Sequence, residues 1–134
     1  MKKLFSARYG AGAVNTAMFI LRIGFGILLF NHGYQKIIHF NATTEHMPAL
    51  FGLSASVRAS MVIFAEFFCS LFIILGLFTR LSCIPIIISL SVALYKSHGM
   101  DVFGPGQAAT LFLIGFIVIL LIGPGKASVD AMIN

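Results

Sequence analysis

The sequence predicts an all-α integral membrane protein, a four-helix bundle with short connections. Hydrophobic residues make up 59% of its 134 residues and charged residues only 10%, a balance that a soluble domain of this size rarely has. The apolar residues also gather in four runs, and a helix needs roughly 20 residues to cross a hydrocarbon core of ~30 Å. Because lipid offers no partners to backbone amides, we expect each run to form a helix.

The four runs predict a single transmembrane domain over residues 1–134. Its spans are expected at about residues 16–38, 59–78, 81–98 and 107–122. Asn15 or Thr16 is a suitable N-cap for the first span. Only Thr79 and Arg80 separate the second span from the third. We therefore expect these two spans to form a tight antiparallel hairpin.

The connection between the first two spans is apolar at "MPALFGL". We predict that residues 47–53 form a short interfacial helix or a re-entrant piece, and the sequence leaves open whether they lie on the membrane or fold into the bundle.

The distribution of basic residues predicts the orientation of the chain in the membrane. Lys and Arg near the ends of the spans favour one side by five to three, which predicts that both termini are cytoplasmic in a cell inner or plasma membrane. The net charge of +5 is scattered over helix ends, so we assign it to lipid headgroups and topology, not to nucleic acid.

A single carboxylate, Glu66, interrupts the apolar run "VIFAEFFCSLFIILGLF" at residues 62–78. An unpaired charge near the centre of a membrane costs about 2.5 to 3.5 kcal/mol on the insertion scale. We therefore expect Glu66 to be paired, protonated or both, with its candidate partners on the first span. Arg22 and His32 could both reach it, and Arg22 is the predicted partner, in an ion pair at the core of the bundle.

Other polar residues recur at helical spacing and predict a second cluster. On the first span, Arg22 and Lys36 lie on one stripe of the helix. His32 lies beside this stripe, four residues before Lys36. On the third, Tyr95 and His98 share a face. We expect His32, Lys36 and His98 to form this second, outward-facing cluster. The buried polar cluster that is the candidate ligand site comprises Arg22, His32, Lys36, Glu66, Tyr95 and His98. The residues expected to be structural are Gly26, Gly33, Gly76 and Arg80.

The sequence contains no pattern for a haem, an iron–sulfur cluster or a metal site. Its two cysteines, Cys69 and Cys83, are expected at unlike depths in the membrane and so cannot ligate a cluster. Any electrons would have to come from a partner protein or from a soluble reductant.

Three segments together resemble the DoxX family of small four-helix membrane proteins. They are "RIGFGILLFNHGYQKI", "AEFFCSLFIILGLFTR" and "SHGMDVFGPGQAATLFLIGFIVILLIGPGKASVD". The positions that carry the family pattern are Arg22, Gly33, Lys36, Glu66, Gly76, Thr79, Arg80, Gly123, Pro124, Gly125, Ser128 and Asp130. The resemblance covers about residues 16–130. The family includes proteins similar to subunits of thiosulfate:quinone oxidoreductase and of terminal quinol oxidase complexes, others linked to oxidative stress or quinone-related detoxification, and many with no assigned activity.

Two hypotheses about function follow. In the first, the protein interacts with a quinone at the polar cluster and serves as a redox subunit or accessory of a membrane oxidoreductase complex. In the alternative, it is a non-catalytic structural or assembly subunit, or a small carrier, in which the buried charges only fix helix packing. The sequence leaves open whether the protein is an enzyme. The expected partners are the lipid bilayer, an oxidoreductase subunit and a second copy of the chain.

Overall fold

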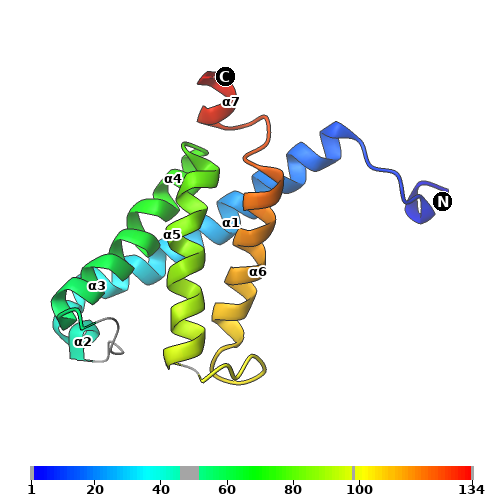
Figure 1. Cartoon of the computed structure of the whole chain (residues 1–134). Helices are drawn as coiled ribbons and strands as arrows, with labels where there is room; N and C mark the ends of the chain where they lie inside the picture. The colour runs from blue at the N-terminus through cyan, green and yellow to red at the C-terminus, as the bar shows by residue number, and fades with distance from the viewer. Residues whose placement is uncertain (1, 46–51, 98, 134) are drawn as a thin grey trace.

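The computed structural model describes residues 2–45, 52–97 and 99–133, and every regular element in these ranges is a helix (Figure 1). The predicted all-α fold class is therefore confirmed. Three continuous helices of the described chain are long and apolar enough to cross a membrane: Ala11–Ile38, Ala55–Leu75 and Thr79–Lys96. A fourth apolar helix, Gln107–Ile122, has 16 residues and a length of about 24 Å at 1.5 Å per residue.

The first long helix, α1 (Ala11–Ile38), begins five residues before the predicted span, and Gly10 is its N-cap. Asn15 and Thr16 are therefore inside the helix, and their prediction as N-caps is wrong. A short 3-10 turn, η1 (Lys2–Phe5), precedes α1, and α2 (Phe40–Glu45) follows it. The segment 47–53 that was predicted to be interfacial lies largely outside the described residues.

The second long helix contains a π-helical turn in its middle. It consists of α3 (Ala55–Ile63), the π-helical η2 (Phe64–Phe68) and α4 (Cys69–Leu75). Ser54 caps its start by accepting a hydrogen bond from the backbone of Val57 at 3.3 Å. Its end is set by Gly76, whose φ of 73° is left-handed and therefore suits glycine.

The chain then turns into α5 (Thr79–Val92), which continues as the π-helical η3 (Ala93–Ser97). After α6 (Gln107–Ile122), a glycine-rich turn leads to the short α7 (Val129–Ile133). Figure 1 shows α1 running beside α3 and α4, with α5 and α6 side by side across them. The predicted hairpin of the second and third long helices is present, since α4 packs against α5.

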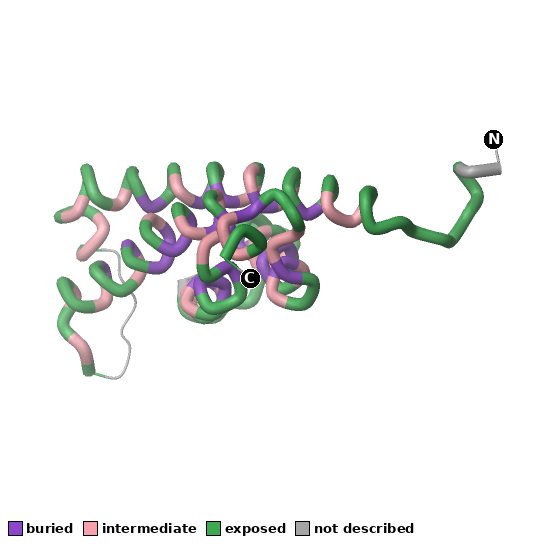
Figure 2. The backbone as a smooth tube through the Cα atoms, turned by 90° about the horizontal axis from the view of Figure 1, so that it is seen from above, coloured by how far each residue is buried: buried purple, intermediate pink, exposed green. Residues whose placement is uncertain are grey.

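The core lies where these two helix pairs meet. It is formed by Met18, Leu29, Cys69, Ile73, Cys83, Ile86, Leu90, Phe116 and Ile119. Figure 2 shows that α1 lies along one edge of the molecule, with the other helices on a single side of it. Gly26 helps to bring α1 close to α4, because a Cβ there would lie 2.7 Å from the Ile74 side chain.

Candidate functional site

Glu66 lies in η2, the π-helical turn of the second long helix, and is only 6% exposed. The Ser70 hydroxyl donates a hydrogen bond of 2.6 Å to the Glu66 carbonyl oxygen. Turns of this kind inside α-helices are frequent at functional sites. The π-helical turn alone therefore makes Glu66 a residue of interest, apart from its charge.

The partner of the Glu66 carboxylate is Lys36 on α1. The Lys36 ammonium donates a hydrogen bond to Oε2 of Glu66 and forms an ion pair with it. The side chain of Lys36 is 30% exposed and that of Glu66 is 8% exposed. The acid is thus enclosed by protein, while the Lys36 side chain is partly exposed.

Gly33 brings the two helices close enough for this pair to form. A Cβ at Gly33 would lie 2.7 Å from the Glu66 carbonyl carbon and 2.7 Å from the Phe67 nitrogen. The backbone of α1 therefore rests directly on η2 at this level. Lys36 follows Gly33 by almost one helical turn, so it lies on the same face of α1.

The predicted ion pair between Arg22 and Glu66 is wrong. The level of Glu66 along α1 is that of Gly33, and Arg22 precedes Gly33 by 11 residues. At 1.5 Å per residue this offset is roughly 16 Å of helix, which is beyond the reach of an arginine side chain. Helical spacing predicted the correct face of α1 for both basic residues, but it does not determine the relative height of the two helices.

Phe67, the residue after Glu66, contacts an aromatic residue of α1. The rings of Phe30 and Phe67 stack at a centroid distance of 4.5 Å. His32 is exposed on α1, and its ring meets Phe112 of α6 edge-on at 5.6 Å. In the described part of the chain, His32 makes no hydrogen bond to Lys36 or Glu66, so its predicted place in a buried polar cluster with them is wrong.

Tyr95 also lies outside the buried cluster that was predicted to contain it. Its side chain is 64% exposed and lies beneath the Lys96 ammonium, which is 5.7 Å from the ring centroid. The reason is that apolar residues, including Leu90 and Leu94, occupy the buried side of this helix. His98, the remaining member of the predicted cluster, lies outside the described residues.

Arg22 is buried at the other end of the bundle, with 1% of its surface exposed. Its Nη2 donates a hydrogen bond of 2.5 Å to the carbonyl oxygen of Ala127, in the segment after α6. Gly76 leaves room for the guanidinium, since a Cβ there would overlap Nη1 of Arg22 and the Ser128 side chain. Arg22 therefore joins α1, the α4–α5 turn and the closing segment of the chain.

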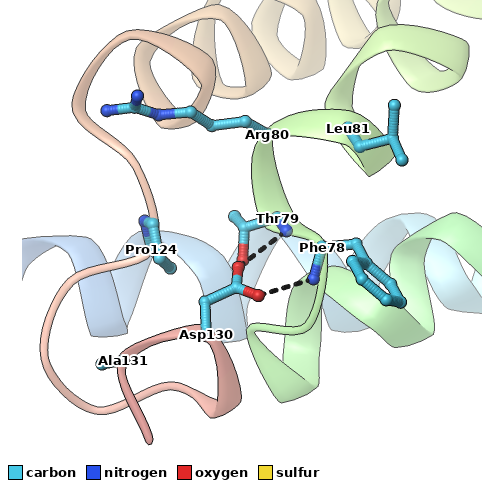
Figure 3. Close-up of a pocket in the computed structure, with 7 residues that line it drawn as sticks. All are labelled: Phe78, Thr79, Arg80, Leu81, Pro124, Asp130 and Ala131. Atoms are coloured by element: carbon cyan, nitrogen blue, oxygen red, sulfur yellow. Dashed lines mark hydrogen bonds between the residues drawn. The ribbon is translucent and has the colours of Figure 1, made fainter. Parts of the chain in front are cut away.

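Asp130 of α7 completes this junction by capping a helix that is distant in sequence. Its two carboxylate oxygens accept hydrogen bonds from the backbone nitrogens of Phe78 at 2.8 Å and Thr79 at 2.9 Å, at the start of α5 (Figure 3). Phe78 has a left-handed φ of 48°, a conformation that costs a non-glycine residue about 1 kcal/mol or more. The carboxylate thus holds an unfavourable turn in place.

The surroundings of Asp130 lower its pKa. Partial burial acts to raise the pKa of the carboxyl group, but the hydrogen bonds from Thr79 and Phe78 and the positive charge of Arg22 act against it. Together they bring the pKa below the ordinary 3.8. Asp130 is therefore a stably ionised cap and a counter-charge for the buried guanidinium.

Arg80 donates hydrogen bonds to the C-terminal end of a neighbouring helix, α6. Its Nη2 donates to the carbonyl oxygens of Ile122 at 3.1 Å and Leu121 at 3.5 Å, in the last turn of α6. A surface hollow of about 410 Å³ lies between the start of α5, Pro124 and α7 (Figure 3). The charged groups that line the hollow, Arg80 and Asp130, are already engaged at helix ends, so we assign this end of the bundle a structural role.

Two participants in this junction were not predicted. The side-chain oxygen of Asn15 accepts a hydrogen bond of 3.0 Å from the backbone nitrogen of Lys126, and the partner of Arg22 is a backbone carbonyl. A backbone acceptor leaves no signal in the sequence.

Among the described residues, no group of three His, Cys, Asp or Glu side chains is placed to hold a metal ion.

Comparison with known proteins supports the resemblance that the sequence suggested. The family model of DoxX matches residues 17–99. The chain belongs to the DoxX family. It is also 25% identical over 122 residues to the inner membrane protein YphA of Escherichia coli strain K12, an alignment that covers 84% of this chain and 87% of YphA. No solved structure matches the chain. Family membership and apolar helices together make this DoxX protein a multi-pass membrane protein.

Proposed function

We propose that this DoxX protein is a membrane subunit that binds a quinone, or a similar lipophilic redox molecule, beside the Lys36–Glu66 ion pair. The observation that carries the proposal is the pair itself: an acid and an amine in an ion pair between two apolar helices, with the acid enclosed and the lysine side chain partly exposed. Ionisable residues within membrane helices are rare, and they commonly mark ligand or proton pathways. A bound quinone would supply the two-electron, two-proton redox chemistry.

The residues around the pair fit such a ligand. An ammonium group has three donor hydrogens, so Lys36 can donate to a carbonyl oxygen while it keeps its bond to Glu66. When a quinone oxygen takes up a proton on reduction by the partner subunit, Lys36 can donate that proton, directly or by way of Glu66. The stacked rings of Phe30 and Phe67 add flat apolar surface near the pair.

The proposal places the protein in a membrane oxidoreductase complex, because the chain itself carries no redox centre pattern and electrons would come from a partner subunit. YphA is named an inner membrane protein, and we propose the same location here. The excess of Lys and Arg on one side of the spans supports cytoplasmic termini.

A second candidate function is a structural or assembly subunit. It is favoured by the close backbone contact between Gly33 and η2, because this contact puts the ion pair at the interface between two helices. In this case the pair would fix the height of α1 against η2 and would contact no ligand.

Extraction of bound quinone from purified protein tests the proposal. The wild type, Glu66→Gln, Lys36→Gln and Lys96→Gln would each be purified in a mild detergent, extracted with organic solvent and assayed by chromatography and a borohydride difference spectrum. Lys96→Gln is the matched control, because it removes an exposed lysine from the same protein. We expect near-stoichiometric quinone in the wild type and the control, and at least a fivefold loss in both variants of the pair.

The opposite outcomes are equally informative. Quinone that stays bound in folded Glu66→Gln and Lys36→Gln would place the ligand elsewhere. Extracts that contain only phospholipid, together with a fold that is lost in Glu66→Gln and regained when Lys36 is also neutralised, would reject the redox function in favour of the structural subunit.

A further inference from the structure

One long face of α1 points away from the rest of the molecule. Figure 2 shows α2 to α7 on the opposite side of α1 and mostly exposed residues along this outer edge. The residues that follow the edge at spacings of three or four are Ala17, Ile20, Gly24, Leu28, Asn31 and Gln35, and all six are exposed. We call these six residues the outer face of α1.

The outer face carries two amide side chains that have no partner in the described residues. Asn31 and Gln35 are one helical turn apart, and neither side chain makes a hydrogen bond to a described residue. Counted from the middle of α1, Asn31 is displaced by roughly 10 Å, inside a hydrocarbon half-thickness of about 15 Å. An amide that faces lipid at this depth loses its hydrogen bonds to water and gains none.

We propose that the outer face of α1 is the interface between two copies of this chain in the membrane. A second copy fits because the amide group both donates and accepts hydrogen bonds, so that Asn31 can pair with Asn31 across a two-fold axis along the membrane normal. Copies with the same topology bring the same residue to the same depth. Polar side chains of this kind hydrogen-bond between helices in membranes.

The backbone of α1 can also approach its partner closely at Gly24. A Cβ built at Gly24 meets nothing within 4 Å, so no contact inside the protomer requires a glycine there. This differs from Gly33, where the fold itself excludes a side chain. Small residues at helix crossings in membranes allow such approach. The inference is independent of quinone binding.

Disulfide cross-linking in native membranes tests the interface. Ile20→Cys places a thiol on the outer face, and Ile114→Cys places one on α6, at an isoleucine of similar exposure, 56% against 64%. The native Cys69 and Cys83 are buried, so the wild type serves as the blank. With a mild oxidant, we expect Ile20→Cys to form disulfide-linked dimers. Ile114→Cys should form no more dimer than the wild type.

Two further variants separate an interface from chance collision. Gly24→Ile should reduce the cross-linking of Ile20→Cys at least fivefold, whereas Gly12→Ile, at a second open glycine that lies 120° around the helix, should leave it unchanged. Asn31→Leu should weaken the dimer by about 3- to 10-fold in a fluorescence transfer assay in detergent.

Four results would overturn the proposal, and the first three concern the cross-linked product. They are only monomer from Ile20→Cys, equal cross-linking from Ile114→Cys, or a cross-linked product whose mass shows a different protein as the partner. A Gly24→Ile variant that folds and still cross-links at the wild-type level would also reject it.

Discussion

Gly33→Ala is the substitution whose effect the structure constrains most closely. The added methyl group would lie 2.7 Å from two backbone atoms of η2, where an ordinary contact is at least 3.4 Å. Because the obstacle is backbone, α1 must move away from η2 by several tenths of an ångström. Overpacking of this kind typically costs about 1 to 3 kcal/mol, and the better helix propensity of alanine returns up to about 1 kcal/mol. We expect a net loss of about 1 to 2 kcal/mol in the free energy of unfolding.

Unfolding by titration of dodecyl sulfate into mixed micelles, followed by circular dichroism, measures this loss. Gly12→Ala is the control, because a Cβ at Gly12 meets nothing within 4 Å. The movement should also weaken the bond between Lys36 and Glu66, so Gly33→Ala and Glu66→Gln should not add when they are combined. A Gly33→Ala variant as stable as Gly12→Ala would show that α1 does not rest on η2 in this way.

The junction at the other end of the bundle gives two more predictions. Asp130→Ala leaves two backbone N–H groups at the start of α5 without an acceptor. We expect it to lower the free energy of unfolding by about 1 to 3 kcal/mol in the same titration. An unchanged midpoint would contradict the capping role. Because the pKa of Asp130 is lower in the folded protein than its ordinary 3.8, its stabilisation is complete above that value and is lost as the pH falls further below it. The wild type should therefore lose more stability than Asp130→Asn in thermal unfolding between pH 5 and about pH 2, and parallel pH profiles would refute this assignment.

The sequence was sufficient for the fold because membrane helices are specified by length and hydropathy. Apolar content alone predicts the helix at residues 107–122, and turn residues predict the turn after Gly76. The start of α1 was not, because a glycine with extended backbone can precede a helix as well as an asparagine can cap one. The π-helical turn at Glu66 also left no pattern, since it depends on how the helix packs and not on a local preference.

The candidate site was predictable in composition but not in pairing. A helical wheel placed Arg22 and Lys36 on the same buried side of α1, and hydropathy identified Glu66 as the acid that needs a partner. The choice between the two bases depends on the relative height of two antiparallel helices, which is set by the contact of Gly33 with η2. Sequence periodicity gives the rotation of a helix but not its axial offset.

The correction from Arg22 to Lys36 changes which variants can test function. Arg22 holds the closing segment through Ala127 and is balanced by Asp130 at the end of the bundle, so its replacement should disturb folding whatever the protein does. Lys36 has a side chain at the surface and a partner that is enclosed, so its replacement can be made without opening that junction. A loss of quinone binding in Lys36→Gln, with an unchanged unfolding midpoint, would therefore speak for a ligand site, whereas the same loss in an Arg22 variant could not separate binding from folding.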